Sequence, residues 1–160
     1  MALKAVVFAA IMLVTLTLVP VGAHFFELPH KIGMTQEHYF TVQEIYRGWA
    51  LFGIPMVGAV PVTMVLAFML RAQAVPFRLA VITVLCLLGA LTIFFVRIYP
   101  ANQATQNWTV VPADWMEWRE QWEYSHAANA ILIFAGWCAL VTAALVTRYP
   151  ARRDSAQRYE

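Results

Sequence analysis

The sequence predicts an all-α fold: a four-helix transmembrane bundle with a short extra amphipathic helix in the outer loop before the fourth span. Hydrophobic residues make up 61% of the 160-residue chain and charged residues 12%, and the mean hydropathy is +0.63. Soluble domains have about twice that charged fraction. Four apolar segments also reach the roughly 20 residues that a helix needs to cross a bilayer. We therefore expect residues 1–160 to form a single integral membrane domain whose main partner is the lipid bilayer.

The predicted spans are the four long apolar runs, residues 5–23, 48–70, 79–96 and 127–147. The second run contains Pro55 and Pro61, which membrane helices tolerate and which predict a kink. The first run follows Lys4 and ends in VGA before His24, so it also resembles a secretory signal peptide with a cleavage site. The net charge of +2 gives no reason to expect a nucleic-acid partner.

Helix boundaries are predicted from prolines and capping residues. Pro29 and Pro100 are expected to end the first and third helices, because a proline removes a backbone donor and restricts the residue before it. Thr35 is the predicted N-cap of a helix that leads toward the second span. Asp114 and Glu117 form a D-x-x-E capping box, which predicts the start of the extra helix before the fourth span.

Tryptophans at positions 115, 118 and 122 recur at i, i+3 and i+7, so they share one face of that extra helix. One interpretation places their indoles at headgroup depth in the membrane interface. The other makes them an aromatic wall for a flat substrate, with Trp118 and Trp122 as binding residues. In that interpretation Asn102 and Gln106, from the segment NQATQN, line the entrance.

Lysines and arginines predict which end of the bundle faces the cytoplasm, because the richer end is cytoplasmic. Seven of the 11 fall at the end that holds both termini: Lys4, Arg71, Arg78, Arg148, Arg152, Arg153 and Arg158. Four fall at the opposite end: Lys31, Arg47, Arg97 and Arg119. Both termini are therefore predicted to be cytoplasmic, with a basic tail at residues 148–160. The two long outer connections hold all four histidines, so we expect the chemistry there.

Two His/Glu pairs form the predicted site. His24 and Glu27 are three residues apart at the outer end of the first span, and Glu123 and His126 are three apart at the start of the fourth. Residues at i and i+3 share a helical face, and the two spans run in opposite directions, so both pairs lie at one depth. If these helices are neighbours, two imidazoles and two carboxylates converge, a ligand set that suits iron, zinc or copper.

Three interpretations of this constellation stay open: a structural polar network, a metal site, and a metal-free acid–base site. In the third, His126 and His24 are the general bases. Asn129, one turn deeper in the fourth span, and Arg97, at the end of the third, then stabilise a substrate oxygen. The expected cofactor is accordingly either none or a transition metal. Ionisable groups at membrane depth favour a functional interpretation.

Three stretches also resemble a known family: GAHFFELPHKI after the first span, YPANQATQNWTVVPADW after the third and WREQWEYSHAAN entering the fourth. Over nearly the whole chain they resemble the small four-helix membrane proteins grouped with fungal anthrone oxygenases. The resemblance implies a four-span bundle and oxygenation of an anthrone to an anthraquinone without an obvious cofactor. The group has bacterial members, and we expect this chain in a bacterial inner membrane with its site on the periplasmic side.

The sequence thus predicts a membrane oxidoreductase or oxygenase, a monooxygenase of the anthrone-oxygenase kind, acting on a hydrophobic aromatic or quinone-like molecule at the outer face. One alternative is a metal- or haem-binding membrane protein that uses the paired His/Glu motifs. Another is a non-enzymatic accessory subunit of a membrane complex, packed through the small residues Gly136, Ala139 and Ala143. A homo-oligomer is left open.

Overall fold

Every regular element in the computed structural model of the chain, which describes residues 1–149, is helical. In order along the chain they are α1 (Ala2–Lys31), α2 (Gln36–Gln43), η1 (Glu44–Tyr46), η2 (Trp49–Phe52), α3 (Gly53–Leu70), α4 (Ala74–Ile93), η3 (Phe94–Ile98), α5 (Tyr99–Ala104) and α6 (Trp115–Val146). Most of the predicted basic tail, from residue 150 onward, lies outside the described residues. Three of the arginines used to predict orientation, Arg152, Arg153 and Arg158, fall there.

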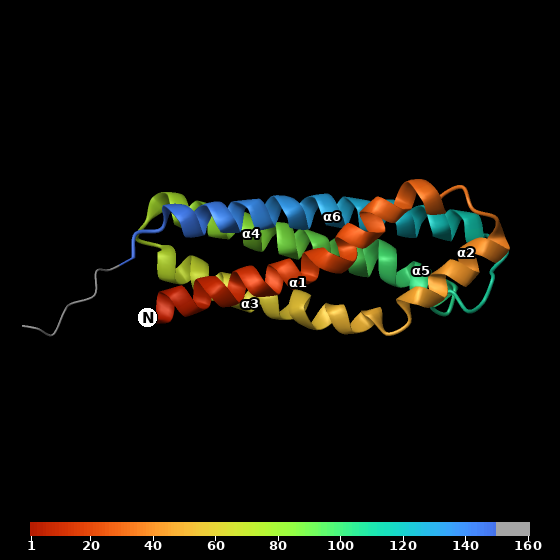
Figure 1. Cartoon of the computed structure of the whole chain (residues 1–160), viewed down its shortest axis with the longest axis horizontal. Coiled ribbons are helices and arrows are strands. Elements are labelled where there is room, and N and C mark those ends of the chain that lie inside the picture. The colour runs from red at the N-terminus through yellow and green to blue at the C-terminus, as the bar shows by residue number, and fades with distance from the viewer. Residues whose placement is uncertain (150–160) are drawn as a thin grey trace, which may run out of the picture.

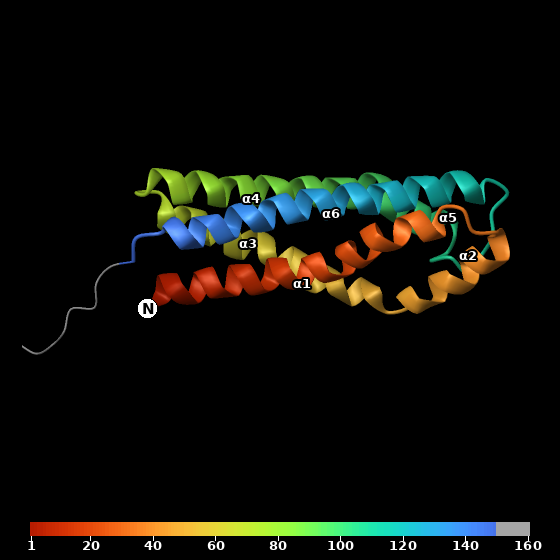
Figure 2. The same ribbon diagram turned by 45° about the horizontal axis from the view of Figure 1, so that its top comes forward.

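Four long helical segments form an antiparallel bundle, as predicted (Figure 1). Residues 2–31, 49–70, 74–104 and 115–146 are each long and apolar enough to cross a membrane, as in an integral membrane protein. Helix α1 packs against α3 and α6, and α4 packs against the same two, so the four helices form a closed ring. Both views place the N-terminus and the end of α6 together, opposite to α2 and α5 (Figure 2). We call the end with α2 and α5 the loop end.

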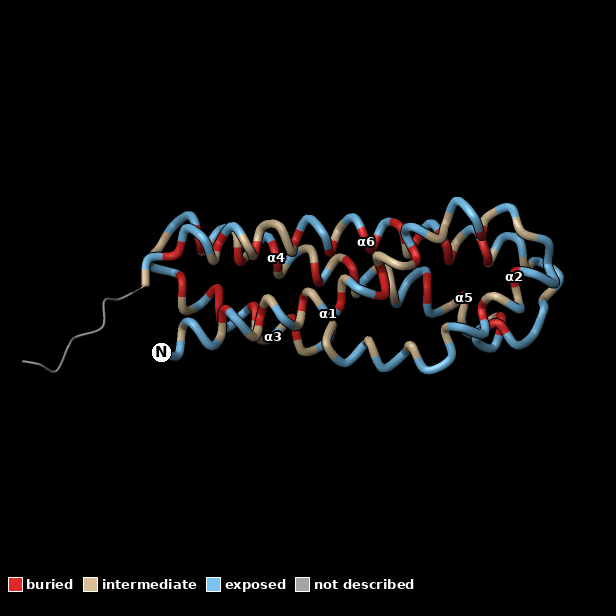
Figure 3. Tube along the Cα trace, viewed as in Figure 1, coloured by how far each residue is buried: buried red, intermediate tan, exposed pale blue. Residues whose placement is uncertain are grey.

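Small residues line the interior of the bundle and bring the helices close together. Ala10, Ala59, Ala80, Ala90 and Ala143 are completely buried. Large apolar side chains instead cover the outward faces of the long helices, where lipid is their solvent. Figure 3 shows the division along the backbone, with buried positions toward the interior and exposed positions on the outside. The small-residue stripe is used within the bundle, because Gly136 of α6 faces Cys86 of α4 at the closest approach.

Two predicted helix ends are wrong. Pro29 lies inside α1, which continues to Lys31, and the backbone N–H of Ile32 still donates to the carbonyl of Leu28. A proline this near the C-terminus costs the helix only one donor. Pro100 does not end the third span either. The π-helical turn η3 precedes it and places it in the first turn of α5, where its missing N–H is not needed.

The extra helix before the fourth span begins where it was predicted but is not separate. Asp114 is the N-cap of α6, although its side chain makes no capping hydrogen bond, and the helix then runs 32 residues without a break. At 1.5 Å per residue it is about 48 Å long, so its first turns extend well beyond a hydrocarbon core of about 30 Å. In the other outer connection, Gly48 has a φ of 87° and separates α2 and η1 from the second span, so that helix does not continue into it.

The close contact at Gly136 can be tested by adding one methyl group. A Cβ at this position would lie 2.9 Å from the Cβ of Cys86, so we expect Gly136→Ala to destabilise the protein by about 1–3 kcal/mol. The matched control is Gly22→Ala, where nothing lies within 4 Å of the added atom. That control should be neutral or stabilising by up to about 1 kcal/mol. Unfolding in detergent measures both, and equal effects would contradict the packing.

Candidate functional site

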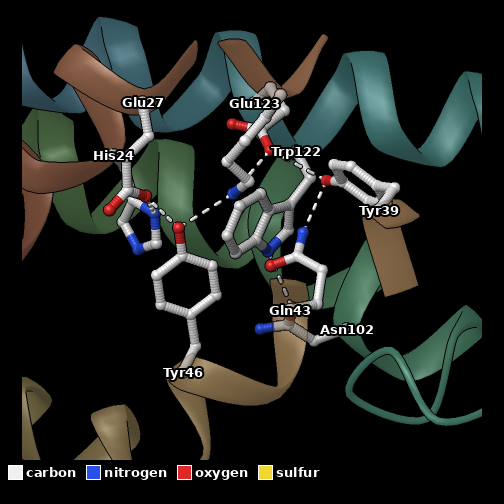
Figure 4. Close-up of polar contacts among 9 residues, drawn as sticks. His24, Glu27, Tyr39, Gln43, Tyr46, Asn102, Trp122 and Glu123 are labelled. Atoms are coloured by element: carbon white, nitrogen blue, oxygen red, sulfur yellow. Dashed lines mark hydrogen bonds and ion pairs between the residues drawn. The ribbon is translucent and has the colours of Figure 1, made fainter. Parts of the chain in front are cut away.

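The His/Glu pairs lie at the loop end, on the last turns of α1 and on α6, and the two histidine rings are in contact. Figure 4 shows His24, Glu27 and Glu123 with their polar partners. Because α1 and α6 are neighbours, the convergence that the sequence left conditional does occur. His24, Glu27 and Lys31 are spaced i, i+3 and i+7, so they share the face of α1 that meets α6. Helix α2 and η1 lie over this junction and add two tyrosines to it.

A buried ion pair lies at the centre of the site. The Lys31 Nζ atom is 2.8 Å from Oε1 of Glu123, and the two side chains are 2% and 0% exposed. Tyr39 donates a 2.9 Å hydrogen bond to the same carboxylate oxygen, and Gln43 donates to the Tyr39 hydroxyl. Lys31 also donates to the hydroxyl of Tyr46 at 2.9 Å. Charges this deeply buried persist only when partners of this kind replace water.

Three aromatic rings enclose the ammonium group of Lys31. Its Nζ atom lies 4.5 Å from the ring centre of Tyr46, 4.8 Å from that of Trp122 and 5.5 Å from that of Tyr39. The negative faces of aromatic rings attract a cation, and more strongly where water is excluded. The cage therefore stabilises the positive charge that Glu123 balances.

The two histidines form a second unit next to this cage. Their ring centres are 4.1 Å apart, and Trp122 contacts both rings, at 4.8 Å from His24 and 4.2 Å from His126. The Nδ1 atoms of both histidines and Oδ1 of Asn129 are buried, and none of them hydrogen-bonds within residues 1–149. An unpaired buried polar atom costs about 1–3 kcal/mol, so these three atoms are available to a bound polar molecule.

Glu27 links the histidines to the surface. Its Oε2 accepts a hydrogen bond from the Tyr46 hydroxyl and lies 4.0 Å from Nδ1 of His24. Its side chain is 34% exposed, whereas that of Glu123 is fully buried. The two carboxylates that the sequence treated as equivalent therefore have different surroundings.

The other predicted site residues do not all lie beside the histidines. The indole of Trp122 donates to Oδ1 of Asn102 at 2.8 Å, so this predicted substrate-binding pair is mutually bonded. Trp118 is half-buried and packs against the cluster that contains Tyr39, Trp108 and Trp122. Arg97 and Gln106 are exposed, and within residues 1–149 neither side chain hydrogen-bonds to the histidines. The structure does not bring these two to the site.

The tryptophan stripe of α6 faces inward. Trp122 is buried, and Trp115 and Trp118 are half-buried against the same aromatic cluster, in which Trp115 contacts Tyr39 and Phe40 of α2. The stripe thus anchors α2 over the loop end and holds the tyrosines in place. The three indoles together therefore form neither a belt at headgroup depth nor an exposed wall for a flat substrate.

The predicted metal ligands are brought near one another but are otherwise engaged. Glu123 pairs with Lys31, and Glu27 bonds to Tyr46. The part of the chain that the structure describes holds no group of three or more histidine, cysteine, aspartate or glutamate side chains arranged to bind a metal ion. The metal interpretation of His24, Glu27, Glu123 and His126 therefore gains no support from this geometry.

Sequence reasoning missed three residues of the site: Lys31, Tyr39 and Tyr46. Lys31 was counted only as a charge outside the membrane, because Pro29 was expected to end α1 two residues earlier. Its spacing of four from Glu27 and seven from His24 was the available signal. Tyr39 and Tyr46 carry the same seven-residue spacing, but only the folding of α2 over α6 shows their partner.

Comparison of the chain with protein-family models, with curated proteins and with solved structures found no match. The function of the site therefore has to be inferred from its own chemistry.

Removing one member of the ion pair should destabilise the protein more than removing both. We expect Glu123→Ala to cost about 3–5 kcal/mol, because it leaves the Lys31 ammonium buried without its partner. The double variant Lys31→Met/Glu123→Leu should lose less than the sum of the single variants. Glu120→Ala, an exposed glutamate one turn earlier in α6, is the control and should change stability by less than about 0.5 kcal/mol. Additive effects in a double-mutant cycle would contradict the pair.

The tyrosines give a second test. Burial, and then the neighbouring Glu123 carboxylate, raise the pKa of Tyr39 far above its ordinary value. Burial and the hydrogen bond to Glu27 raise the pKa of Tyr46 in the same direction. Both phenols should stay protonated in the folded protein at about pH 11, whereas unfolded tyrosines ionise near pH 10. The stability they contribute is therefore present below pH 10 and is lost as the pH rises further.

Tyrosinate absorbance measures this effect. At about pH 11 the folded wild type and the Tyr39→Phe/Tyr46→Phe variant should show the same tyrosinate signal. A wild-type excess corresponding to two tyrosinates, with the fold intact, would show that these phenols are not protected.

Proposed function

We propose that the protein is a membrane oxygenase or related oxidoreductase that acts on a hydrophobic aromatic or quinone-like molecule at the outer end of the bundle. The observation that carries this proposal is the contact between His24 and His126, whose Nδ1 atoms are buried and unbonded within residues 1–149. Two imidazoles in an aromatic, largely water-excluded setting are suited to removing a weakly acidic proton.

The chemistry suited to these residues starts with an aromatic ketone such as an anthrone, whose methylene group lies beside the conjugated carbonyl system. A histidine removes one methylene proton, and the carbanion is delocalised onto the carbonyl oxygen as an enolate. Dioxygen then reacts at that carbon. In total the carbon loses two hydrogens and gains one oxygen atom, and the other oxygen atom leaves as water. This balance needs no other reductant or oxidant.

Lys31 takes the role that the sequence had assigned to Arg97. The ammonium group of Lys31 and the ring of His24 both contact Tyr46 and Trp122, so the cation lies close to the base. A fixed cation beside the base favours the enolate over the neutral ketone, and more strongly in a low-dielectric setting. Oδ1 of Asn129 is available to accept a phenolic O–H of the substrate.

An apolar hollow offers an approach from the membrane. It has a volume of about 330 Å³ and is lined by Leu16, Gly48, Leu51, Phe52 and Pro55. Trp49 connects this hollow to the histidines, since its ring centre is 5.7 Å from that of Phe52 and 5.6 Å from that of His24. A flat apolar molecule, and dioxygen with it, would therefore approach His24 from the lipid past Trp49 and Tyr46, which both contact the His24 ring.

The test measures anthraquinone formation and dioxygen uptake by detergent-purified protein supplied with an anthrone, above the rate without protein. We expect His24→Ala/His126→Ala to lower kcat by at least about 100-fold, the smallest usual contribution of a general base. The matched control is His30→Ala/His38→Ala, which removes two exposed histidines of the same outer connection and should leave the rate unchanged.

Two results would contradict the proposal. One is a folded double variant that keeps the full rate, and the other is a wild type that turns over neither anthrones nor hydroquinones. Elemental analysis of the same samples separates the metal-binding alternative. Stoichiometric iron, copper or zinc in the wild type, lost from the His24→Ala/His126→Ala variant only, would favour that alternative.

A further inference from the structure

We propose that Glu27 is the proton exit of this site: the proton that His24 takes from the substrate passes to Glu27 and from there to water. This inference rests on the proposed function, because it assigns the path of the proton that leaves the substrate before dioxygen reacts. One proton is taken up again from water when the second oxygen atom leaves as water, so the overall reaction releases none. It is carried by three features of Glu27: its contact with His24, its bond to Tyr46 and its exposure.

Glu27 places a carboxylate close to the unbonded nitrogen of His24. Its Oε2 atom lies 4.0 Å from His24 Nδ1 and is held by the hydroxyl of Tyr46. Closing the gap to hydrogen-bond distance requires a movement of about 1 Å, which a glutamate side chain makes by rotating its χ angles. Residues 24 and 27 share one face of α1, so this movement needs no change in the backbone.

Exposure separates the roles of the two carboxylates. The Glu123 side chain is fully buried, and its Oε1 is held by Lys31 and Tyr39, so it serves as a fixed counter-charge. The Glu27 side chain is 34% exposed and can exchange protons with water at the loop end. His126 lies next to His24, with the two ring centres 4.1 Å apart, so His24 is between His126 and this exit.

The proton transfer balances without an electron acceptor. The substrate C–H bond breaks, its electron pair stays on the substrate as the enolate, and the proton is bound by His24. The imidazolium then donates its Nδ1–H to Oε2 of Glu27, and the protonated carboxyl group releases the proton to water. The histidine returns to its neutral form and the glutamate to its charged form.

The first arm of the test is Glu27→Gln, which keeps the size of the side chain and an oxygen acceptor for Tyr46 but cannot carry the proton. We expect kcat to fall by about 100-fold with KM unchanged. Added formate or acetate should restore a large part of the rate, because the exit is partly exposed and a small carboxylate can replace it. Glu120→Gln, which alters an exposed glutamate of α6, is the control and should change nothing.

The second arm needs no turnover. Solvent exchange of the His24 ring N–H, followed by ¹⁵N NMR of the protein in micelles, should slow by at least about tenfold in Glu27→Gln and stay unchanged in Glu120→Gln. Glu27→Asp, which keeps the carboxylate, should retain most of the exchange rate and guards against a folding defect. If Glu27→Gln slows the exchange but the wild type has no oxygenase activity, the proposed function is refuted and the exit is kept. Unchanged exchange in Glu27→Gln would overturn the exit whatever the activity.

Discussion

The arrangement of the loop end depends on the buried ion pair between Lys31 and Glu123. It joins the last turn of α1 to α6, and these helices carry the two His/Glu motifs. The pair also positions the outer segment, because Tyr39 of α2 and Tyr46 of η1 each hydrogen-bond to one of its members. The ion pair therefore joins α1 to α6 at the loop end and orders the segment that covers them, while Trp137 bonds to Thr15 deeper in the bundle.

The ion pair is not the simplest way to stabilise such a junction. Well-packed apolar residues of the same volume often give equal or greater stability than a buried pair. A purely structural role therefore explains poorly why charges lie at this depth. A functional role explains the buried charges better. A fixed cation beside two imidazoles that are unbonded at Nδ1 would stabilise negative charge that develops next to a base.

Stability and chemistry are separated along the length of the bundle. In the membrane interior, buried alanines and the close approach of Gly136 to Cys86 hold the helices together, and Thr83 and Trp137 add hydrogen bonds between helices. At the loop end, aromatic side chains replace alanine, and polar groups are bonded to one another within an apolar surrounding. The continuous helix α6 connects the two regions and transmits the rigidity of the bundle to Trp122, Glu123 and His126.

The amino-acid sequence by itself determined the four spans and their antiparallel order, because apolar length is a local property of the chain and successive membrane crossings alternate in direction. It also identified His24, Glu27, Glu123 and His126, since their i, i+3 spacing is visible once the spans are placed. The prolines misled the boundary predictions, because a proline near a helix end or after a π-turn costs little backbone hydrogen bonding.

Only the tertiary structure decided which side chains meet. Lys31 and Glu123 are 92 positions apart in the sequence, and nothing local indicates that a lysine near the membrane surface is buried against a carboxylate. The same holds for Tyr39, whose partner lies on α6. The two glutamates also differ in burial: Glu123 contacts Lys31 and Tyr39 and is fully buried, whereas Glu27 bonds to Tyr46 and is partly exposed. Burial of this kind depends on the packing of distant segments, which a one-dimensional pattern does not contain.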